Sequence, residues 1–247
     1  MHGLYHVGTK YESENSSMSF FSNFTKTMER FPNWLWLPTC EICQMQKEHF
    51  VTRSVCRTCW SILFSPPRPI YLQPGITLRS AALYQGHWRS FLLKAKFQNN
   101  RFAQENLQKA LCTMIVQQRL PHPVDLVIPI PSSWFRSVVR RGSLTFDGAN
   151  MVAKKLGVPL LDKIVEKTRW VPSQSKLNCK KMRKANMSNA FVAKRLSLNK
   201  HILLFDDVCT TGATLQAAVN ALLAYKPASV TCVTFLRSDL EVSRTII

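Results

Sequence analysis

Long hydrophobic segments are missing from this sequence. No apolar run approaches the roughly 20 residues that a membrane-spanning helix needs. The N-terminus also lacks the basic-then-apolar order of a signal peptide. These absences predict a cytoplasmic protein without membrane insertion. Apolar residues still make up 46% of the 247 residues, enough for one sizeable α/β domain and a small appendage.

Acidic residues are also scarce, with 14 Asp and Glu against 33 Lys and Arg and a formal net charge of +19. The imbalance is uneven, because residues 1–60 are nearly balanced whereas residues 167–200 carry ten basic side chains and no acidic one. Such a field attracts polyanions and predicts contact with nucleic acid. The alternative is a cationic surface that only keeps the protein soluble. The candidate nucleic-acid residues are Arg89, Lys94, Lys96, Lys176, Lys180, Lys181, Arg183 and Lys184.

Four of the eight cysteines form two short pairs, Cys40-x-x-Cys43 and Cys56-x-x-Cys59, with twelve residues between the pairs. Two such pairs can place four thiolates tetrahedrally around one Zn²⁺. Disulfides are disfavoured in the cytosol, and a redox-active pair would not need a duplicate. We therefore predict a structural zinc site with no open position for a catalytic water. His49 is an alternative ligand.

Residues 201–215 form the most informative segment, His-Ile-Leu-Leu-Phe-Asp-Asp-Val-Cys-Thr-Thr-Gly-Ala-Thr-Leu. Its apolar run predicts a buried strand, Asp206 and Asp207 stand at the carboxyl end, and a small polar loop opens a helix. Two carboxylates thus lie beside backbone N–H groups at a helix N-terminus, where phosphate binds well. A ribose 5-phosphate would satisfy both halves of this arrangement. The alternative is an ordinary strand–turn–helix with a solvated acidic pair.

Apolar runs and helical spacings alternate along most of the chain. They predict strands at 76–84, 125–131, the start of 201–215 and 229–236, and helices at 87–96, 102–118, 146–156 and 215–224. This alternation favours an α/β fold with a doubly wound, mostly parallel sheet.

Composition divides the chain into three parts. Residues 1–30 are polar and without a clear period, which predicts a flexible extension. Residues 31–65 hold the cysteine pairs and predict a small zinc-binding module. A segment with four prolines between 66 and 74 predicts a linker. Residues 76–240 then form the expected α/β domain.

The 201–215 segment closely resembles the phosphoribosyl-pyrophosphate (PRPP) motif of type I phosphoribosyltransferases. This resemblance implies that Asp206 and Asp207 are catalytic residues at the ribose hydroxyls. It implies Mg²⁺ bound with PRPP, held largely by ligand oxygens and water. Catalysis then rests on positioning and charge stabilisation. The residues that it assigns to the 5-phosphate are Thr210, Thr211, Gly212, Ala213 and Thr214.

Further blocks, in order over roughly residues 38–240, resemble the ComF family, named for its part in DNA uptake during natural competence. Beside the cysteine pairs they are Tyr84-Gln-Gly86-x-x-Arg89, Lys96-Phe97, Val127-Ile-Pro-Ile-Pro131, Arg140-Arg141-Gly142, Arg169 with Gln174 and Leu177, and Arg183-x-x-Asn186. The chain departs from the family where Phe146-Asp147-Gly148, displaced by an insertion, stands in place of Phe-Asn-Gln. It departs again at Val171, where the family usually has Thr.

The ComF resemblance implies a protein of natural transformation that binds PRPP and helps to handle incoming single-stranded DNA, beside a helicase or a recombination mediator. Two alternatives remain open, a nucleobase phosphoribosyltransferase of salvage metabolism and a non-catalytic adaptor with a vestigial PRPP site. The candidates for pyrophosphate or anion contact are Pro129, Ile130, Pro131, Arg136, Arg140, Arg141 and Arg169.

Overall fold

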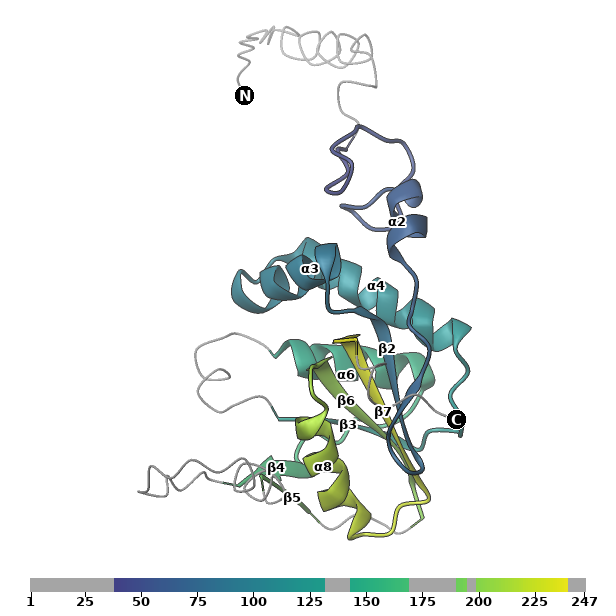
Figure 1. The fold of residues 1–247 in the computed structure, drawn as a ribbon, viewed down its shortest axis with the longest axis vertical. Helices are drawn as coiled ribbons and strands as arrows, with labels where there is room; N and C mark the ends of the chain where they lie inside the picture. Colours follow the sequence, from purple (N-terminus) through teal and green to yellow (C-terminus); the bar gives the residue numbers. More distant parts are fainter. Residues whose placement is uncertain (1–37, 132–142, 169–189, 195–198, 240–247) are drawn as a thin grey trace, which may run out of the picture.

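The computed structural model describes residues 38–131, 143–168, 190–194 and 199–239. The predicted extension 1–30 lies outside these ranges. Figure 1 shows a central sheet flanked by helices, with the cysteine-containing segment at one end of the molecule. The elements are α2 (Arg57–Leu63), β1 (Ile70–Gln73), β2 (Ile76–Leu83), α3 (Gly86–Phe97), α4 (Arg101–Gln117), β3 (Leu126–Pro129), α6 (Leu144–Leu156), β4 (Val165–Lys167), β5 (Phe191–Ala193), β6 (His201–Cys209), α8 (Ala213–Leu223) and β7 (Ser229–Arg237).

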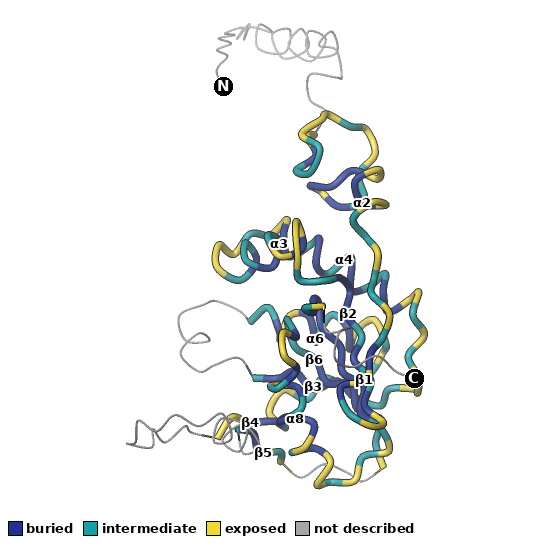
Figure 2. The backbone as a smooth tube through the Cα atoms, viewed as in Figure 1, coloured by how far each residue is buried: buried dark blue, intermediate teal, exposed yellow. Residues whose placement is uncertain are grey.

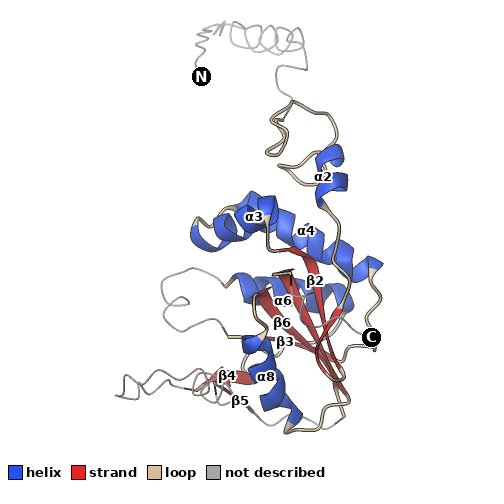
Figure 3. Ribbon diagram, viewed as in Figure 1, coloured by secondary structure: helices blue, strands red, loops and turns tan. Residues whose placement is uncertain are grey.

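The main sheet has five strands in the order β1-β2-β7-β6-β3 (Figure 3). The pairings of β2 with β7, of β7 with β6 and of β6 with β3 are parallel, and only the edge strand β1 is antiparallel. The carboxyl ends of β3 and β6 therefore meet at one edge, where Pro129 lies opposite Phe205. The predicted α/β fold with a doubly wound, mostly parallel sheet is confirmed.

The hydrophobic core is divided by the sheet into two layers (Figure 2). Because successive side chains of a strand point to opposite faces, Leu203 and Phe205 of β6 pack with α4 and α6, whereas Ile202 and Leu204 pack with α8. All four side chains are buried. Parallel strands covered on both faces explain why the 201–215 segment begins with a continuous apolar run.

Helix α6 approaches the sheet closely at Gly148. A Cβ at this position would lie 2.6 Å from ring atoms of Phe205 and Phe235. The two rings pack edge to face, with centroids 5.2 Å apart. A glycine is thus required for the close contact between α6 and the strands β6 and β7.

The predicted helices and the strands β2, β3 and β7 lie within about two residues of their predicted bounds, whereas α2 was not predicted and β6 continues through the acidic pair to Cys209. Gly157 ends α6 in a left-handed conformation (φ 70°), as a helix stop signal predicts. The predicted proline-rich linker is in part wrong, since Ile70–Gln73 forms strand β1, which pairs with β2 across a turn at Gly75 (φ 76°). The prolines flank this edge strand and do not interrupt it. The two-stranded ribbon of β4 and β5 is a further difference, because three-residue strands leave almost no periodicity.

The cysteine-containing segment packs on α3 and α4. The ring of Trp60 contacts that of Trp88 edge to face at 5.8 Å, and the Trp88 indole N–H donates to the carbonyl of Leu63 at 3.0 Å. Asn106 of α4 donates to the hydroxyl of Ser54 at 3.0 Å. Lys94 of α3 pairs with Glu41. The segment shares one hydrophobic cluster with these helices, so its stability is coupled to the packing of α3 and α4.

Among the described residues, no helix has the length and the apolar character that crossing a membrane requires.

Candidate functional site

The four paired cysteines converge on one point. The Sγ atoms of Cys40, Cys43, Cys56 and Cys59 all lie within 4.8 Å of one another. A tetrahedral zinc site with bonds of about 2.3 Å has sulfur separations of about 3.8 Å, so the cluster has the right size and donor set. All four coordination positions of such a site would be filled by protein thiolates. This geometry agrees with the predicted structural zinc site, and His49 is not needed as a ligand.

The electrostatics of the cluster favour a bound cation. Burial disfavours the Cys40 thiolate, but backbone N–H groups of Cys56, Cys43 and Ile42 outweigh it and lower the pKa of Cys40 to about 6. The N–H of Cys56 donates to the Cys40 Sγ at 3.4 Å. Burial and the neighbouring thiols raise the pKa of Cys59 to about 12 when no cation is present. Four thiolates in this volume would repel one another, and a divalent ion would remove that repulsion.

The acidic pair lies near the carboxyl end of β6, at the sheet edge that β3 also reaches. The predicted positions of Asp206 and Asp207 are both on β6 itself, and both residues are partly buried. The backbone N–H of Asp207 donates to Oδ1 of Asp206 at 2.8 Å. Both residues therefore lie near the edge where ligands of open α/β sheets bind.

Asp207 is held by two helices that are far away in the sequence. Lys96 of α3 places its Nζ 2.7 Å from Oδ1, and the two side chains are only 17% and 16% exposed. Thr145, in the first turn of α6, donates its hydroxyl to Oδ2 at 3.2 Å. Each carboxylate oxygen has a second lone pair, so Asp207 can still accept hydrogen bonds from a ligand.

Asp206 is in a different electrostatic position. Burial and the negative charge of Asp207 raise the pKa of Asp206 to about 7, against the opposing effects of the Asp207 backbone N–H and of Lys96 and Lys167. Near neutral pH Asp206 therefore gives up its proton less readily than an ordinary aspartate does. A protonated carboxyl can donate a hydrogen bond and an ionised one can only accept, so Asp206 can serve a hydroxyl-bearing ligand in either role.

The loop that follows β6 opens helix α8. Gly212, the N-cap residue, is in a left-handed conformation (φ 78°), which other residues rarely adopt. Thr210, Thr211 and Thr214 are exposed, and the hydroxyl of Thr211 accepts the N–H of Ala213 at a long 3.4 Å. The N–H groups of the first turn of this eleven-residue helix lack intrahelical partners, and with three nearby hydroxyl side chains they form the kind of helix N-terminus that binds anions.

The Pro-Ile-Pro turn reaches the same edge. Pro129 ends β3, and the N–H of Ile130 donates to the Phe205 carbonyl at 2.8 Å, one residue before Asp206. The side chain of Ile130 is buried. Pro129 and Pro131 have no N–H and that of Ile130 is already used, so the turn presents no free backbone donor to an anion at this edge.

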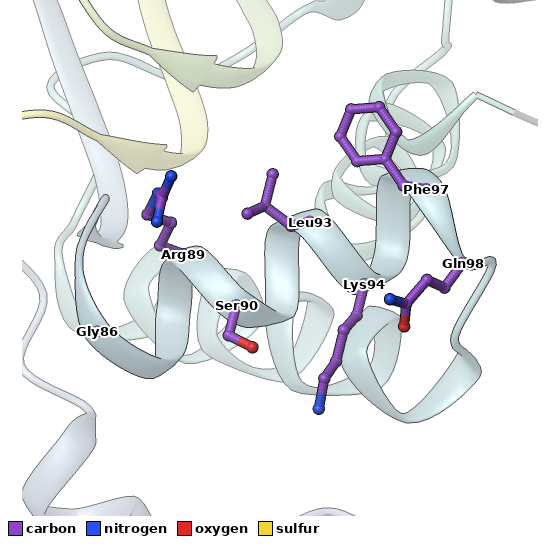
Figure 4. Close-up of a pocket in the computed structure, with 7 residues that line it drawn as sticks. All are labelled: Gly86, Arg89, Ser90, Leu93, Lys94, Phe97 and Gln98. Atoms are coloured by element: carbon purple, nitrogen blue, oxygen red, sulfur yellow. The ribbon is translucent and has the colours of Figure 1, made fainter.

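Helix α3 carries three of the candidate nucleic-acid residues, and they face different ways. Lys96 points to the acidic pair, Lys94 to Glu41, and Arg89 lies 5.8 Å over the ring of Tyr84. Arg89 and Lys94 also line a pocket of about 440 Å³ on α3. Figure 4 shows this pocket, which is completed by Gly86, Ser90, Leu93, Phe97 and Gln98. Trp88 is buried and has no face available for stacking.

Several predicted residues lie outside the described parts of the chain: Arg136, Arg140, Arg141, Arg169, Lys176, Lys180, Lys181, Arg183 and Lys184. Conversely, two residues act on the acidic pair although no sequence pattern predicted that they lie near it. Thr145 belongs to the insertion that departs from the ComF pattern, and Lys167 was only one of ten cations in a basic run. Lys167 of β4 acts on Asp206 and lies 5.7 Å over the ring of Phe191.

Comparison with known proteins places part of this chain in a known class. Residues 139–241, from shortly before α6 to shortly after β7, match the family model described as "Phosphoribosyl transferase domain". No curated protein sequence matches the chain significantly.

Solved structures similar to the chain include glutamine PRPP amidotransferase from B. subtilis, with 18% identity, a TM-score of 0.40 and coverage of 58% of this chain and 30% of that protein. Adenine phosphoribosyltransferase from Saccharomyces cerevisiae has 14% identity and a TM-score of 0.40, over 72% of this chain and 86% of that one. The enzyme from Leishmania tarentolae has 12% identity and a TM-score of 0.40, over 71% and 95%. The chain thus spans less than a third of the first protein and most of the other two. In its fold class and over residues 139–241, which include the acidic pair and the loop before α8, this protein is similar to the phosphoribosyltransferases.

Proposed function

We propose that this protein binds PRPP with Mg²⁺ at the edge formed by β3, β6 and the start of α8. The observation that carries the proposal is the juxtaposition of the Asp206–Asp207 pair with the Gly212 loop at the N-terminus of α8. One element suits vicinal hydroxyls and the other suits a phosphate. A ribose 5-phosphate unit joins these two groups in one small molecule.

The residues of this edge have separate tasks in the proposed complex. The ribose hydroxyls donate to Asp207, which Lys96 and Thr145 hold in place, and exchange hydrogen bonds with Asp206. The 5-phosphate is bound by the backbone N–H groups of residues 212–214 and by the hydroxyls of Thr210, Thr211 and Thr214. Mg²⁺ would supply charge neutralisation at the pyrophosphate, with its coordination completed largely by ligand oxygens and water.

We further propose that the protein is of the ComF type and acts in natural transformation, where it handles incoming single-stranded DNA. The ordered ComF-like blocks and the net charge of +19 support this role. The α3 pocket adds to the support, because it combines Arg89 and Lys94 with the exposed ring of Phe97. Cations beside an aromatic face suit single-stranded nucleic acid. The proposed protein partner is a DNA-uptake helicase or a recombination mediator.

The decisive experiment is calorimetric titration of PRPP with Mg²⁺ into the wild type and the Asp206→Asn/Asp207→Asn double variant. We expect binding by the wild type and a loss of affinity of about 10- to 100-fold or more in the variant, because charge-assisted hydrogen bonds to the ribose disappear. Asp162→Asn, which alters an exposed carboxylate in a turn, is the matched control and should bind as the wild type does. A wild type that does not bind PRPP would overturn the proposed function.

Two further assays separate the proposed role from its alternatives. Salt-dependent affinity for single-stranded DNA supports the ComF-type role, and its absence contradicts that role. Release of pyrophosphate in the presence of a nucleobase identifies a salvage phosphoribosyltransferase instead. An adaptor with a vestigial site is indicated if neither PRPP nor DNA binds.

A further inference from the structure

The two lysines near the end of α3 lie in different environments. Residues two apart on a helix are rotated by about 200°, so Lys94 pairs with Glu41 of the cysteine segment while Lys96 is directed to Asp207. The rotation of α3 about its axis is fixed, because its side chains Trp88, Phe91, Leu92 and Ala95 are buried against neighbouring elements. This rotation directs Lys96 toward the acidic pair.

The Lys96–Asp207 pair is also less exposed than the Lys94–Glu41 and Lys200–Asp125 pairs. Its side chains are 17% and 16% exposed, compared with 35% and 29% for Lys94–Glu41 and 43% and 39% for Lys200–Asp125. Burying a lysine beside a carboxylate has a desolvation cost that an exposed lysine avoids. A lysine needed only to attract nucleic acid would gain more from an exposed position.

We infer that Lys96 is a positioning residue of the phosphoribosyl site, which holds the carboxylate of Asp207 oriented toward the ribose hydroxyls of the ligand. This inference rests on the proposed function for its ligand. Thr145 supports Asp207 from the opposite helix, at its other oxygen. Helices α3 and α6 thereby hold one carboxylate between them, and its remaining lone pairs stay available to the ligand.

The arrangement divides the two acidic residues into different roles. Groups from every neighbouring element act on Asp206: Asp207 of β6, Lys96 of α3, Lys167 of β4 and the thiol of Cys232 on β7. The two lysines favour its ionised form and Asp207 opposes it. With Lys96 removed, the pair should keep a proton to higher pH and offer the ribose hydroxyls one ionised acceptor fewer.

The test measures affinity for PRPP with Mg²⁺ between pH 6 and pH 9 in the wild type, Lys96→Met, Lys96→Arg and Lys200→Met. The last variant is the matched control, because Lys200 faces Asp125 at the opposite end of β6. We expect Lys96→Met to weaken binding by about tenfold or more at pH 7 and to shift the pH midpoint of binding upward. Lys96→Arg should retain the midpoint, and Lys200→Met should match the wild type in both respects.

A second measurement does not depend on PRPP. Carbon-detected NMR titration of the Asp206 and Asp207 carboxyl groups in the ligand-free protein should show a higher apparent pKa in Lys96→Met than in the wild type, with a folded spectrum otherwise. Unchanged carboxyl titration overturns the inference, as does wild-type PRPP affinity at every pH in Lys96→Met. If the wild type fails to bind PRPP while the carboxyl titration shifts as expected, the proposed function fails and the positioning role stands.

Discussion

Two groups of neighbouring acidic side chains lie in this molecule, and their negative charge is balanced in different ways. The thiols of the cysteine cluster come from residues 40–59 and are influenced mainly by one another and by backbone N–H groups. The Asp206–Asp207 pair receives Lys96 from α3, a hydroxyl from α6 and the field of Lys167 from β4. The thiols have the geometry to be balanced by a cation from outside, whereas the carboxylates are balanced by side chains of the protein.

The difference shows how each group is suited to a different task. A metal occupies every donor of a four-thiolate site, so the cluster can stabilise structure but cannot bind a substrate at the metal. The carboxylate pair keeps unused lone pairs, so it can accept hydrogen bonds from a ligand. The first group needs only a short segment of chain, and the second needs three docked elements.

The largest expected effect comes from removing the cation of the thiol cluster. Treatment with a chelator, or Cys59→Ser, should destabilise the cysteine segment by several kcal/mol, because uncompensated thiolates repel and the Trp60–Trp88 contact is lost. Thermal unfolding with and without chelator measures the effect, and mass spectrometry should find one zinc per chain. Cys112→Ser, outside the cluster, is the control. A metal-free protein of unchanged stability would contradict the zinc assignment.

Gly148→Ala tests how closely α6 must pack against β6 and β7. Helix propensity by itself predicts that alanine stabilises α6 by about 0.5–1 kcal/mol. The 2.6 Å contacts with the rings of Phe205 and Phe235 predict the opposite sign, a loss of about 2–3 kcal/mol. Urea unfolding decides between the two. A stabilised variant would show that α6 can move away from β6 without loss.

Asp206→Asn tests the internally balanced pair through the pH dependence of stability. The raised pKa of Asp206 means that the folded state binds its proton more tightly than the unfolded state does. Ionised Asp206 therefore lowers stability as the pH rises from about 4, and the loss is complete above about 7. Asp206→Asn should raise the free energy of unfolding by about 1–2 kcal/mol at pH 8 and change it little at pH 4.

Urea unfolding of Asp206→Asn at pH 4, 6 and 8 measures this dependence, with Asp162→Asn as the control. If the free energies of unfolding of variant and wild type differ by the same amount at every pH, Asp206 is ionised as easily in the folded protein as in the unfolded chain.

The smallest expected effect concerns the ion pair between the two regions. Lys94→Met removes the contact between Lys94 and Glu41, two side chains that are each about a third exposed. The expected loss is about 0.5 kcal/mol at low salt and less at 0.5 M salt, because solvent and ions screen such pairs. Urea unfolding at both salt concentrations measures it, with Lys109→Met on α4 as the control. A loss above about 1.5 kcal/mol would mean that Lys94 is essential for docking of the cysteine segment.

Much of the fold could be predicted because its information is local. The apolar run before Asp206 predicts a buried strand, and the spacing of Gly157 after a helical pattern predicts where α6 ends. The two cysteine pairs and the 201–215 segment are equally local, since each brings its functional groups together within a few turns of chain. These features allowed the fold class, the thiol cluster and the position of the acidic pair to be recognised.

Other features were decided only by the tertiary structure. The sequence alone placed Lys96 among surface cations, and nothing in it linked Thr145 to Asp207. Which face of α3 looks toward β6 depends on how Trp88, Phe91 and Leu92 pack against neighbouring elements. Strand β1 and the β4–β5 ribbon were missed because their pairing gives them stability that four- and three-residue segments do not have alone. Local periodicity determines which side of an element is buried, but the partner across that interface, here 111 residues away, is chosen by the packing of the whole chain.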